Sequence, residues 1–195
     1  DIFDRYKTLK KILPKKKLIV FDIGANEGQT IKEIAKNFSK ADIHSFEPQE
    51  SCQKNLTNLS KNLKKVKVFL NNVACGEKNK HKIFYVNSKS SVLSSFLKIN
   101  TNSKLFLKMK KLSKQKKYLN SINQPKKIKQ IALSSYIKKK GIKNIDIMKI
   151  DVQGYEKNVL MGIKNNDLKK IKTLVLEINL WDFYDKNTTV YDLEK

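Results

Sequence analysis

The chain has 195 residues, a length that suits one domain built around a single hydrophobic core. No apolar run approaches the roughly 20 residues of a membrane span, and no signal-peptide pattern opens the chain. Cys52 and Cys75 are too few for a disulfide framework, so a reduced cytoplasmic location is expected.

The net charge of +24 comes almost entirely from lysine, because Arg5 is the only arginine among 42 basic residues. Between Lys78 and Ile145 there are 19 lysines and no acidic residue. Such a field would concentrate anionic partners, whether phosphate-bearing glycans, lipid head groups or RNA. A coding bias is the alternative, because asparagine and isoleucine are also abundant and nucleic-acid readers normally rely on arginine.

Hydrophobic periodicity predicts strands and helices that alternate along the chain. We expect strands over 18–21, 42–46, 66–70, 81–86, 128–133, 146–152 and 173–180, the fourth of them at a sheet edge. Helices are expected over 31–38, 49–63 and 135–140, with another after Gly154; Ser134 would cap the third helix and Gly141 would end it. This order predicts an α/β domain whose mostly parallel sheet is flanked by helices.

Two segments stand apart from this alternation within a single domain over residues 1–195. Residues 1–17 read as a basic helix or arm that Pro14 interrupts. Residues 87–130 are polar, rich in lysine and weakly patterned, although 93–112 is compatible with a helix. The second segment is too long for an ordinary connection, so we expect either a lid over the substrate or a mobile insertion.

The first predicted strand runs into a glycine turn. The apolar run 18–21 ends at Asp22, glycines follow at 24 and 28, and Glu47 ends the second strand 25 residues beyond Asp22. Strand, glycine turn, helix, strand and acid is the plan of a nucleoside-binding βαβ unit, in which the acid accepts hydrogen bonds from a ribose diol. A turn that only connects two elements is the alternative.

The centre of this turn, Ala25-Asn26-Glu27, departs from the G-x-G-x-x-G pattern that holds a pyrophosphate. Carboxylates at Asp22 and Glu27 would repel a pyrophosphate, but they suit the ammonium and sulfonium charges of S-adenosylmethionine. The candidate cofactor-binding residues are Asp22, Gly24, Ala25, Asn26, Gly28, Gln29 and Thr30 around the methionine portion, Glu47 with Pro48 at the ribose, and Asn72, Val73 and Ala74 at the adenine. Gln29 and Thr30 also suit simple capping of the helix, and the last three also suit a structural loop.

The predicted strand 146–152 contains the first candidate for catalysis. Asp151 lies at its carboxyl end, where open α/β sheets place ligands, and strand alternation puts Lys149 on the same side. Methyl transfer requires alignment of the acceptor, and an acceptor that is a hydroxyl must also lose its proton, so we expect Asp151 as the base or orienting group and Glu177 as the second candidate. Lys149 is expected to pair with Asp151 or Glu177, which also suits a structural ion pair. Glu156, the last candidate, opens the next helix, where a carboxylate also stabilises the helix dipole.

Four sequence landmarks follow one another in order: Phe21–Gly28, Ser45–Pro48, Asn72–Gly76 and Met148–Glu156. With them, residues 18–180 resemble the FkbM family of S-adenosylmethionine-dependent methyltransferases, and the run Lys-Ile-Asp-Val-x-Gly-x-Glu is the most specific match. The resemblance implies a Rossmann-like class I methyltransferase fold and O-methylation of sugar or other small-molecule hydroxyls.

The chain departs from the family pattern at three places. Gln153 stands where the family more often has Glu, and Ala132-Leu133-Ser134 replaces the usual Thr-Leu-Asp. Nothing after Leu180 supplies the antiparallel hairpin that usually closes a methyltransferase sheet, and the chain starts at Asp1. We therefore expect a truncated or incompletely represented protein.

Three functions are compatible with these patterns. The leading one is an O-methyltransferase acting on a hydroxyl of a glycan or another small molecule, and the lysine field would suit an anionic acceptor. The second is an RNA methyltransferase that uses the basic residues 78–145, although no aromatic interleaving marks them as a base-stacking surface. The third is a non-catalytic cofactor- or anion-binding protein. His44 and His81 are expected to be structural, and no cluster has metal-ligand spacing, which leaves a carboxylate-bound Mg²⁺ open.

Overall fold

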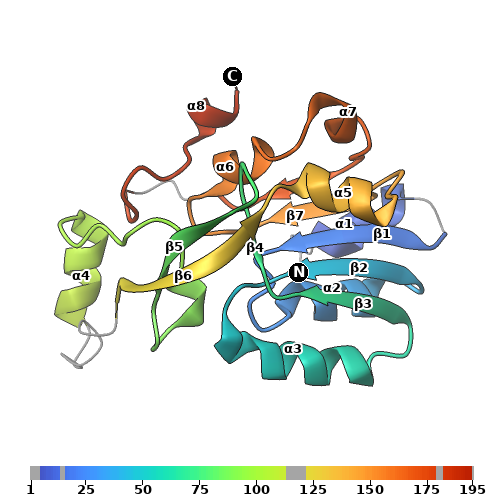
Figure 1. Ribbon diagram of the computed structural model, residues 1–195. Helices are drawn as coiled ribbons and strands as arrows, with labels where there is room; N and C mark the ends of the chain where they lie inside the picture. The colour runs from blue at the N-terminus through green and yellow to red at the C-terminus, as the bar shows by residue number, and fades with distance from the viewer. Residues whose placement is uncertain (1–4, 14–15, 113–121, 179–181, 195) are drawn as a thin grey trace.

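The computed structural model describes residues 5–13, 16–112, 122–178 and 182–194, which form two β-sheets with helices around them (Figure 1). The larger sheet is parallel throughout and has the strand order β3-β2-β1-β7-β8. Its strands are β1 (Leu18–Ile23), β2 (Ala41–Phe46), β3 (Val66–Asn71), β7 (Ile147–Ile150) and β8 (Leu174–Leu176). The predicted α/β, Rossmann-like fold class is confirmed.

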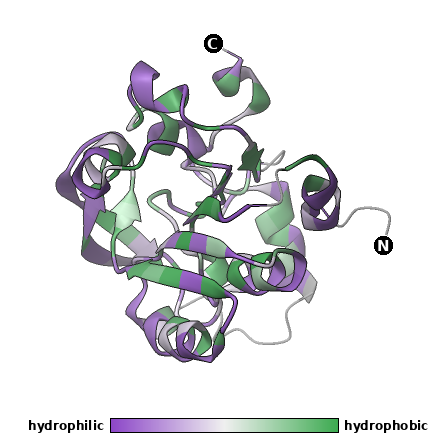
Figure 2. Ribbon diagram, turned by 90° about the vertical axis from the view of Figure 1, so that its right-hand side faces the viewer, coloured by the Kyte–Doolittle hydropathy of each residue, from purple (hydrophilic) through white to green (hydrophobic). Residues whose placement is uncertain are grey.

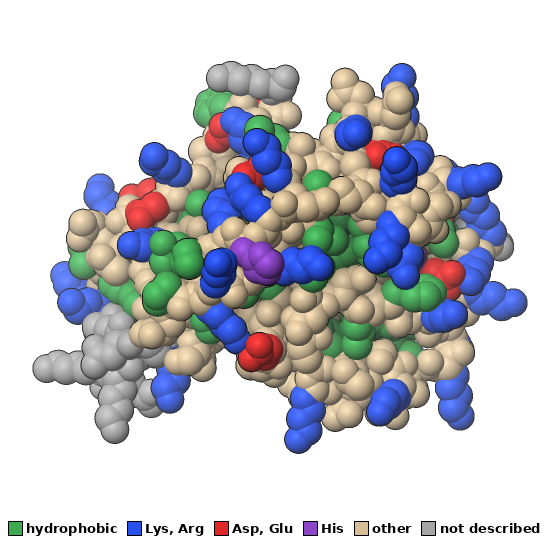
Figure 3. Space-filling model, viewed as in Figure 1, with side chains coloured by type: hydrophobic (Ala, Val, Ile, Leu, Met, Phe, Trp, Pro, Cys, Tyr) green, Lys and Arg blue, Asp and Glu red, His purple; other side chains and the backbone are tan. Residues whose placement is uncertain are grey.

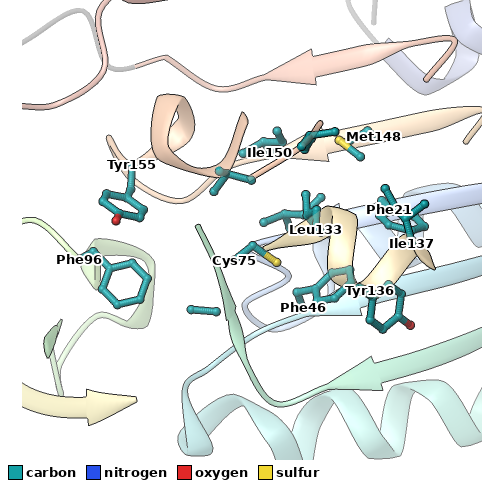
Figure 4. Close-up of a cluster of buried hydrophobic side chains, with 14 of the residues drawn as sticks. Phe21, Phe46, Cys75, Phe96, Leu133, Tyr136, Ile137, Met148, Ile150 and Tyr155 are labelled. Atoms are coloured by element: carbon teal, nitrogen blue, oxygen red, sulfur yellow. The ribbon is translucent and has the colours of Figure 1, made fainter. Parts of the chain in front are cut away.

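Helices cover both faces of the larger sheet, because alternating side chains are buried on each face. One face packs against α1 (Arg5–Ile12), α2 (Gln29–Asn37) and α3 (Glu50–Asn62), and the other packs against α5 (Leu133–Lys140) and α6 (Glu156–Leu160), which α7 (Asn165–Leu168) follows. Val20 and Ile43 point to the first face, whereas Phe21 and Phe46 meet Tyr136 of α5 on the second (Figure 4). The helices are accordingly amphipathic, with hydrophilic and hydrophobic stretches alternating along them (Figure 2).

The smaller sheet has the order β4-β6-β5 and packs on the α5 side. It consists of β4 (Ala74–Cys75), β5 (Lys80–Val86) and β6 (Gln124–Ile131), with β5 antiparallel to β6 and at the edge, as predicted. Between β5 and β6 the chain forms the 3₁₀ helix η1 (Ser91–Leu93) and α4 (Lys104–Leu112). Phe106 of α4 packs with Phe183 and Tyr184, which precede α8 (Val190–Leu193).

Several predicted boundaries were wrong. The strand expected over 128–133 is β6, which ends at Ile131, and the helix expected within 93–112 is only the last part of that range. Ser134 does not cap α5, because the helix already begins at Leu133; its hydroxyl instead donates to Asp167 and accepts from the backbone N–H of Lys164. The strand expected over 173–180 is shorter, and its residues 179 and 180 lie outside the described residues.

Beyond β8, the described residues 182–194 add no strand to the larger sheet. No helix in the described part of the chain is long and apolar enough to cross a membrane.

The order of the larger sheet creates a topological switch point between β1 and β7. From β1 the chain moves outward to β2 and β3 on one side, and it later returns to β7 on the other side. Crossover connections leave such a point in opposite directions, so a crevice opens outside the carboxyl ends of the two strands. The fold therefore directs a ligand to the ends of β1 and β7.

Candidate functional site

A cavity of about 530 Å³ lies at this switch point. Its walls come from the carboxyl ends of β1, β2, β7 and β8, from β4 and β5, from α1 and α2, and from the segment around η1. The size is in the range of sites that enclose a small molecule.

Ten of the predicted site residues line the cavity: Gly24, Asn26, Gln29, Thr30, Glu47, Pro48 and Ala74 among the cofactor candidates, and Lys149, Asp151 and Glu177 among the catalytic candidates. The other predicted residues lie outside the lining: Asp22, Ala25, Gly28, Asn72, Val73 and Glu156.

The glycine turn is fastened to the end of β2 and passes very close to β7. The backbone N–H groups of Gly24 and Ala25 both donate to the carbonyl oxygen of Phe46, at 3.0 and 3.1 Å. Gly24 has φ +83°, and a Cβ at this position would overlap the carbonyl oxygen of Asp151. Only glycine satisfies both conditions, so the turn needs Gly24 to hold the two strand ends together.

Glu47 is buried in the cavity wall, with 4% of its surface exposed. Its Oε2 accepts from the backbone N–H of Asn26 at 2.8 Å and its Oε1 accepts from the backbone N–H of Gln49 at 2.9 Å. Burial raises the pKa of the Glu47 carboxyl, and these two backbone donors oppose the rise. Each carboxylate oxygen keeps a further lone pair, so Glu47 can still accept hydrogen bonds from a diol.

Lys149 lies between two carboxylates at the ends of β1 and β7. Its Nζ is 3.0 Å from Asp151 Oδ2 and 3.7 Å from Asp22 Oδ1, and it donates to the carbonyl oxygen of Gly24 at 3.2 Å. Burial lowers the pKa of Lys149, but the two carboxylates outweigh it and the net effect is a rise. Asp22 is fully buried, and burial raises the pKa of its carboxyl against the opposing charge of Lys149. Of the two predicted partners of Lys149, the ion pair forms with Asp151; Asp22 joins it, since Asp22 is opposite Lys149 in the strand register.

Asp151 and Glu177 form a carboxyl pair on the same side of the cavity. Asp151 Oδ1 accepts from Nε2 of Gln153 at 2.7 Å, so a hydrogen-bond donor reaches each of its oxygens. Burial raises the pKa of Glu177, and the charge of neighbouring Asp151 raises it further against the opposing charges of Lys149 and Arg5. Glu156 has a different place: its buried Oε1 accepts from the backbone N–H groups of Val152 and Gly154, at 3.1 Å each, and so orders the turn after β7.

A strap of residues 91–96 lines the cavity next to the small sheet. The Ser91 hydroxyl and the Asn26 amide exchange hydrogen bonds at 3.0 and 3.1 Å, and Gln49 Nε2 donates to the Ser91 carbonyl at 3.1 Å. At its other end, Ser95 Oγ donates to the Gln153 carbonyl at 2.8 Å. Phe96 of the strap lines the cavity and packs against the ring of Tyr155 (Figure 4).

The strap and α1 are the parts of the cavity that sequence motifs did not reveal. The strap falls within the segment expected to be a lid or insertion, but no pattern singled out Ser91 or Phe96. Arg5 and Tyr6 of α1 also line the cavity, and a basic amphipathic segment alone gives no sign of such a role.

The two histidines lie away from the cavity lining. Burial lowers the pKa of His44 to about 4, and its Nδ1 is 2.8 Å from the hydroxyl of Tyr136. His81 is exposed on β5. Within the described residues, no group of three histidine, cysteine or acidic side chains could hold a metal ion.

The parallel sheet, the glycine turn and the buried acid after β2 define a Rossmann-like domain with a cavity at its switch point. Residues 22–194 match the family model of the methyltransferase FkbM domain, and the chain belongs to this family of methyltransferases. No curated protein and no solved structure matches the chain.

Proposed function

We propose that this protein is an S-adenosylmethionine-dependent O-methyltransferase acting on a hydroxyl group of a glycan or another small molecule. One observation carries the proposal: a single cavity joins the buried acid Glu47 to the carboxyl pair of Asp151 and Glu177. The first group suits the ribose of a nucleoside donor, and the second suits the deprotonation of an alcohol.

The residues around the glycine turn fit this donor. Glu47 would accept from the two ribose hydroxyls, and Ala74 would lie beside the adenine. Gly24 has no side chain to fill the space beside the turn, and Asp22 and Asp151 supply negative charge near it. When bound, S-adenosylmethionine supplies an electrophilic methyl group.

The two carboxyl groups have different roles toward the acceptor. Lys149 and Gln153 hold Asp151 in one orientation, so Asp151 is suited to align the acceptor hydroxyl. Glu177 has the raised pKa and lies at the exposed edge of the cavity, so it is the better group to take the proton as the new carbon–oxygen bond forms.

Transfer of label from S-[methyl-³H]adenosylmethionine to fractionated cell extract tests the proposal. We expect base-stable label in a glycan or small-molecule fraction, and a loss of about 100-fold or more with Glu177→Gln. Glu50→Gln is the matched control, since Glu50 is exposed, pairs with Lys126 and does not line the cavity. Donor binding without label in any fraction would favour the non-catalytic alternative.

The lysine-rich stretch between 78 and 145 keeps RNA as a second candidate acceptor. Basic side chains are scattered over the visible face rather than gathered into one stripe along a groove (Figure 3). A nucleic-acid backbone would need a continuous track of basic side chains, so the distribution on this face favours the small-molecule proposal. Label that ribonuclease removes would reverse this preference.

A further inference from the structure

The N-terminal helix α1 brings the chain's single arginine to the cavity. Arg5 lines the cavity, and it precedes residues 22–194, which match the family model. Tyr6 beside it is only 5% exposed and packs in the same core cluster as Ile31 and Ile34 of α2. Because Tyr6 anchors the first turn of α1, the neighbouring Arg5 has a defined place at the cavity wall.

Three cationic side chains line the cavity in the part of the chain that the structure describes, and they differ in their partners. Lys149 is paired with Asp151 and Asp22, and Lys36 lies 3.9 Å from the carboxylate of Glu33. Arg5, in contrast, makes no hydrogen bond or ion pair with any residue of the described ranges 5–13, 16–112, 122–178 and 182–194, although its charge lowers the pKa of Glu177, which also lines the cavity. The described residues therefore use none of the N–H donors of its guanidinium, and these donors can bind a ligand.

The position of Arg5 also fits the direction in which the donor would lie. Phe46 and Ala74 line the cavity on the side of Glu47, where the adenine is proposed, and Tyr6 and Thr30 line it on the side of α1. A nucleoside held by Glu47 would then have room for its amino-acid portion on the side of Gly24 and α1.

We infer that Arg5 binds a carboxylate of a ligand in the cavity, with a guanidinium fork that pairs with the two carboxylate oxygens. This inference rests on the proposed function. The methionine carboxylate of the donor is the first source, and an acidic group of the acceptor is the second. Arginine is suited to the task because its planar donors match both oxygens, which the point charge of a lysine does not.

Calorimetry with two ligands separates these sources. S-adenosylhomocysteine has the carboxylate, and 5′-methylthioadenosine lacks the whole amino-acid group. If Arg5 binds the donor, Arg5→Gln weakens S-adenosylhomocysteine on the order of ten- to a hundredfold and leaves methylthioadenosine unchanged. Arg5→Lys should be intermediate, and Lys10→Gln is the matched control on the same helix, exposed and outside the cavity lining.

If Arg5 binds the acceptor, Arg5→Gln changes neither nucleoside but abolishes the binding of glucuronate to the protein saturated with S-adenosylhomocysteine. Equal weakening of both nucleosides, or no change in any of the three ligands, would overturn the inference. A wild-type protein that binds neither nucleoside would instead refute the proposed function, and the role of Arg5 with it.

Discussion

The ion pair of Lys149 with Asp22 should be a main support of the site, and Lys149→Met tests this. Only 9% of the Lys149 side chain and none of the Asp22 side chain is exposed. Removing one partner leaves a buried charge without compensation, which typically costs about 3–5 kcal/mol. Total stabilities are about 5–15 kcal/mol, so the free energy of unfolding should fall by a large fraction. Lys17→Met is the control, because Lys17 pairs with Asp42 at the surface, where such a loss is at most about 1 kcal/mol.

The loss of stability in Lys149→Met should also depend on pH, and the burial of Asp22 determines the direction of this dependence. Burial already raises the pKa of Asp22, and without Lys149 it would rise further. A raised pKa means that the folded state prefers the protonated carboxyl, so the deficit of Lys149→Met should shrink as pH falls from 8 to 5. Urea denaturation at both pH values measures it, and Asp22→Asn added to Lys149→Met should recover stability. A deficit no larger than that of Lys17→Met, or one independent of pH, would refute the reasoning.

Three further predictions follow from the site. Asp151→Asn should move the acid limb of kcat/KM to lower pH, because it removes a charge that raises the pKa of Glu177; an unmoved limb would speak against Glu177 as the base. Gly24→Ala should lose about 1–3 kcal/mol more in urea denaturation than Gly141→Ala, since both glycines have positive φ but only at Gly24 would a Cβ overlap backbone; equal losses would contradict this. Ser91→Ala should speed the dissociation of S-adenosylhomocysteine about 2- to 10-fold in stopped-flow experiments, because it releases the strap from the glycine turn; an unchanged rate would rule out the strap as a closure.

The glycine turn and Glu47 could be predicted from sequence because local chain geometry determines them. About 30 residues contain all the features needed: a buried strand, a turn that requires positive φ, and an acid at the end of the next strand. Strand register then placed Lys149 opposite Asp22, a contact between distant segments that alternation alone could not choose. For this reason the prediction named Asp151 and Glu177 as the partners of Lys149 but not Asp22.

The strap and α1 could not be predicted, because their places depend on tertiary packing. Ser91 follows β5, and its hydrogen bond with Asn26 depends on where the pairing of β5 with β6 places this loop. Arg5 lies at the cavity wall because Tyr6 packs in the same core cluster as residues of α2. Neither contact leaves a periodic pattern in the sequence, and the many lysines of the chain obscure weaker hydrophobic patterns.

Calorimetric binding of S-adenosylhomocysteine to the wild-type protein, Glu47→Ala and Glu50→Ala tests the central claim most directly. We predict that the wild type and Glu50→Ala bind alike, while Glu47→Ala weakens binding by more than about tenfold, since Glu47 is in the cavity wall and Glu50 is exposed. A folded wild-type protein that does not bind, or a Glu47→Ala variant that binds as well as the wild type, would contradict the account.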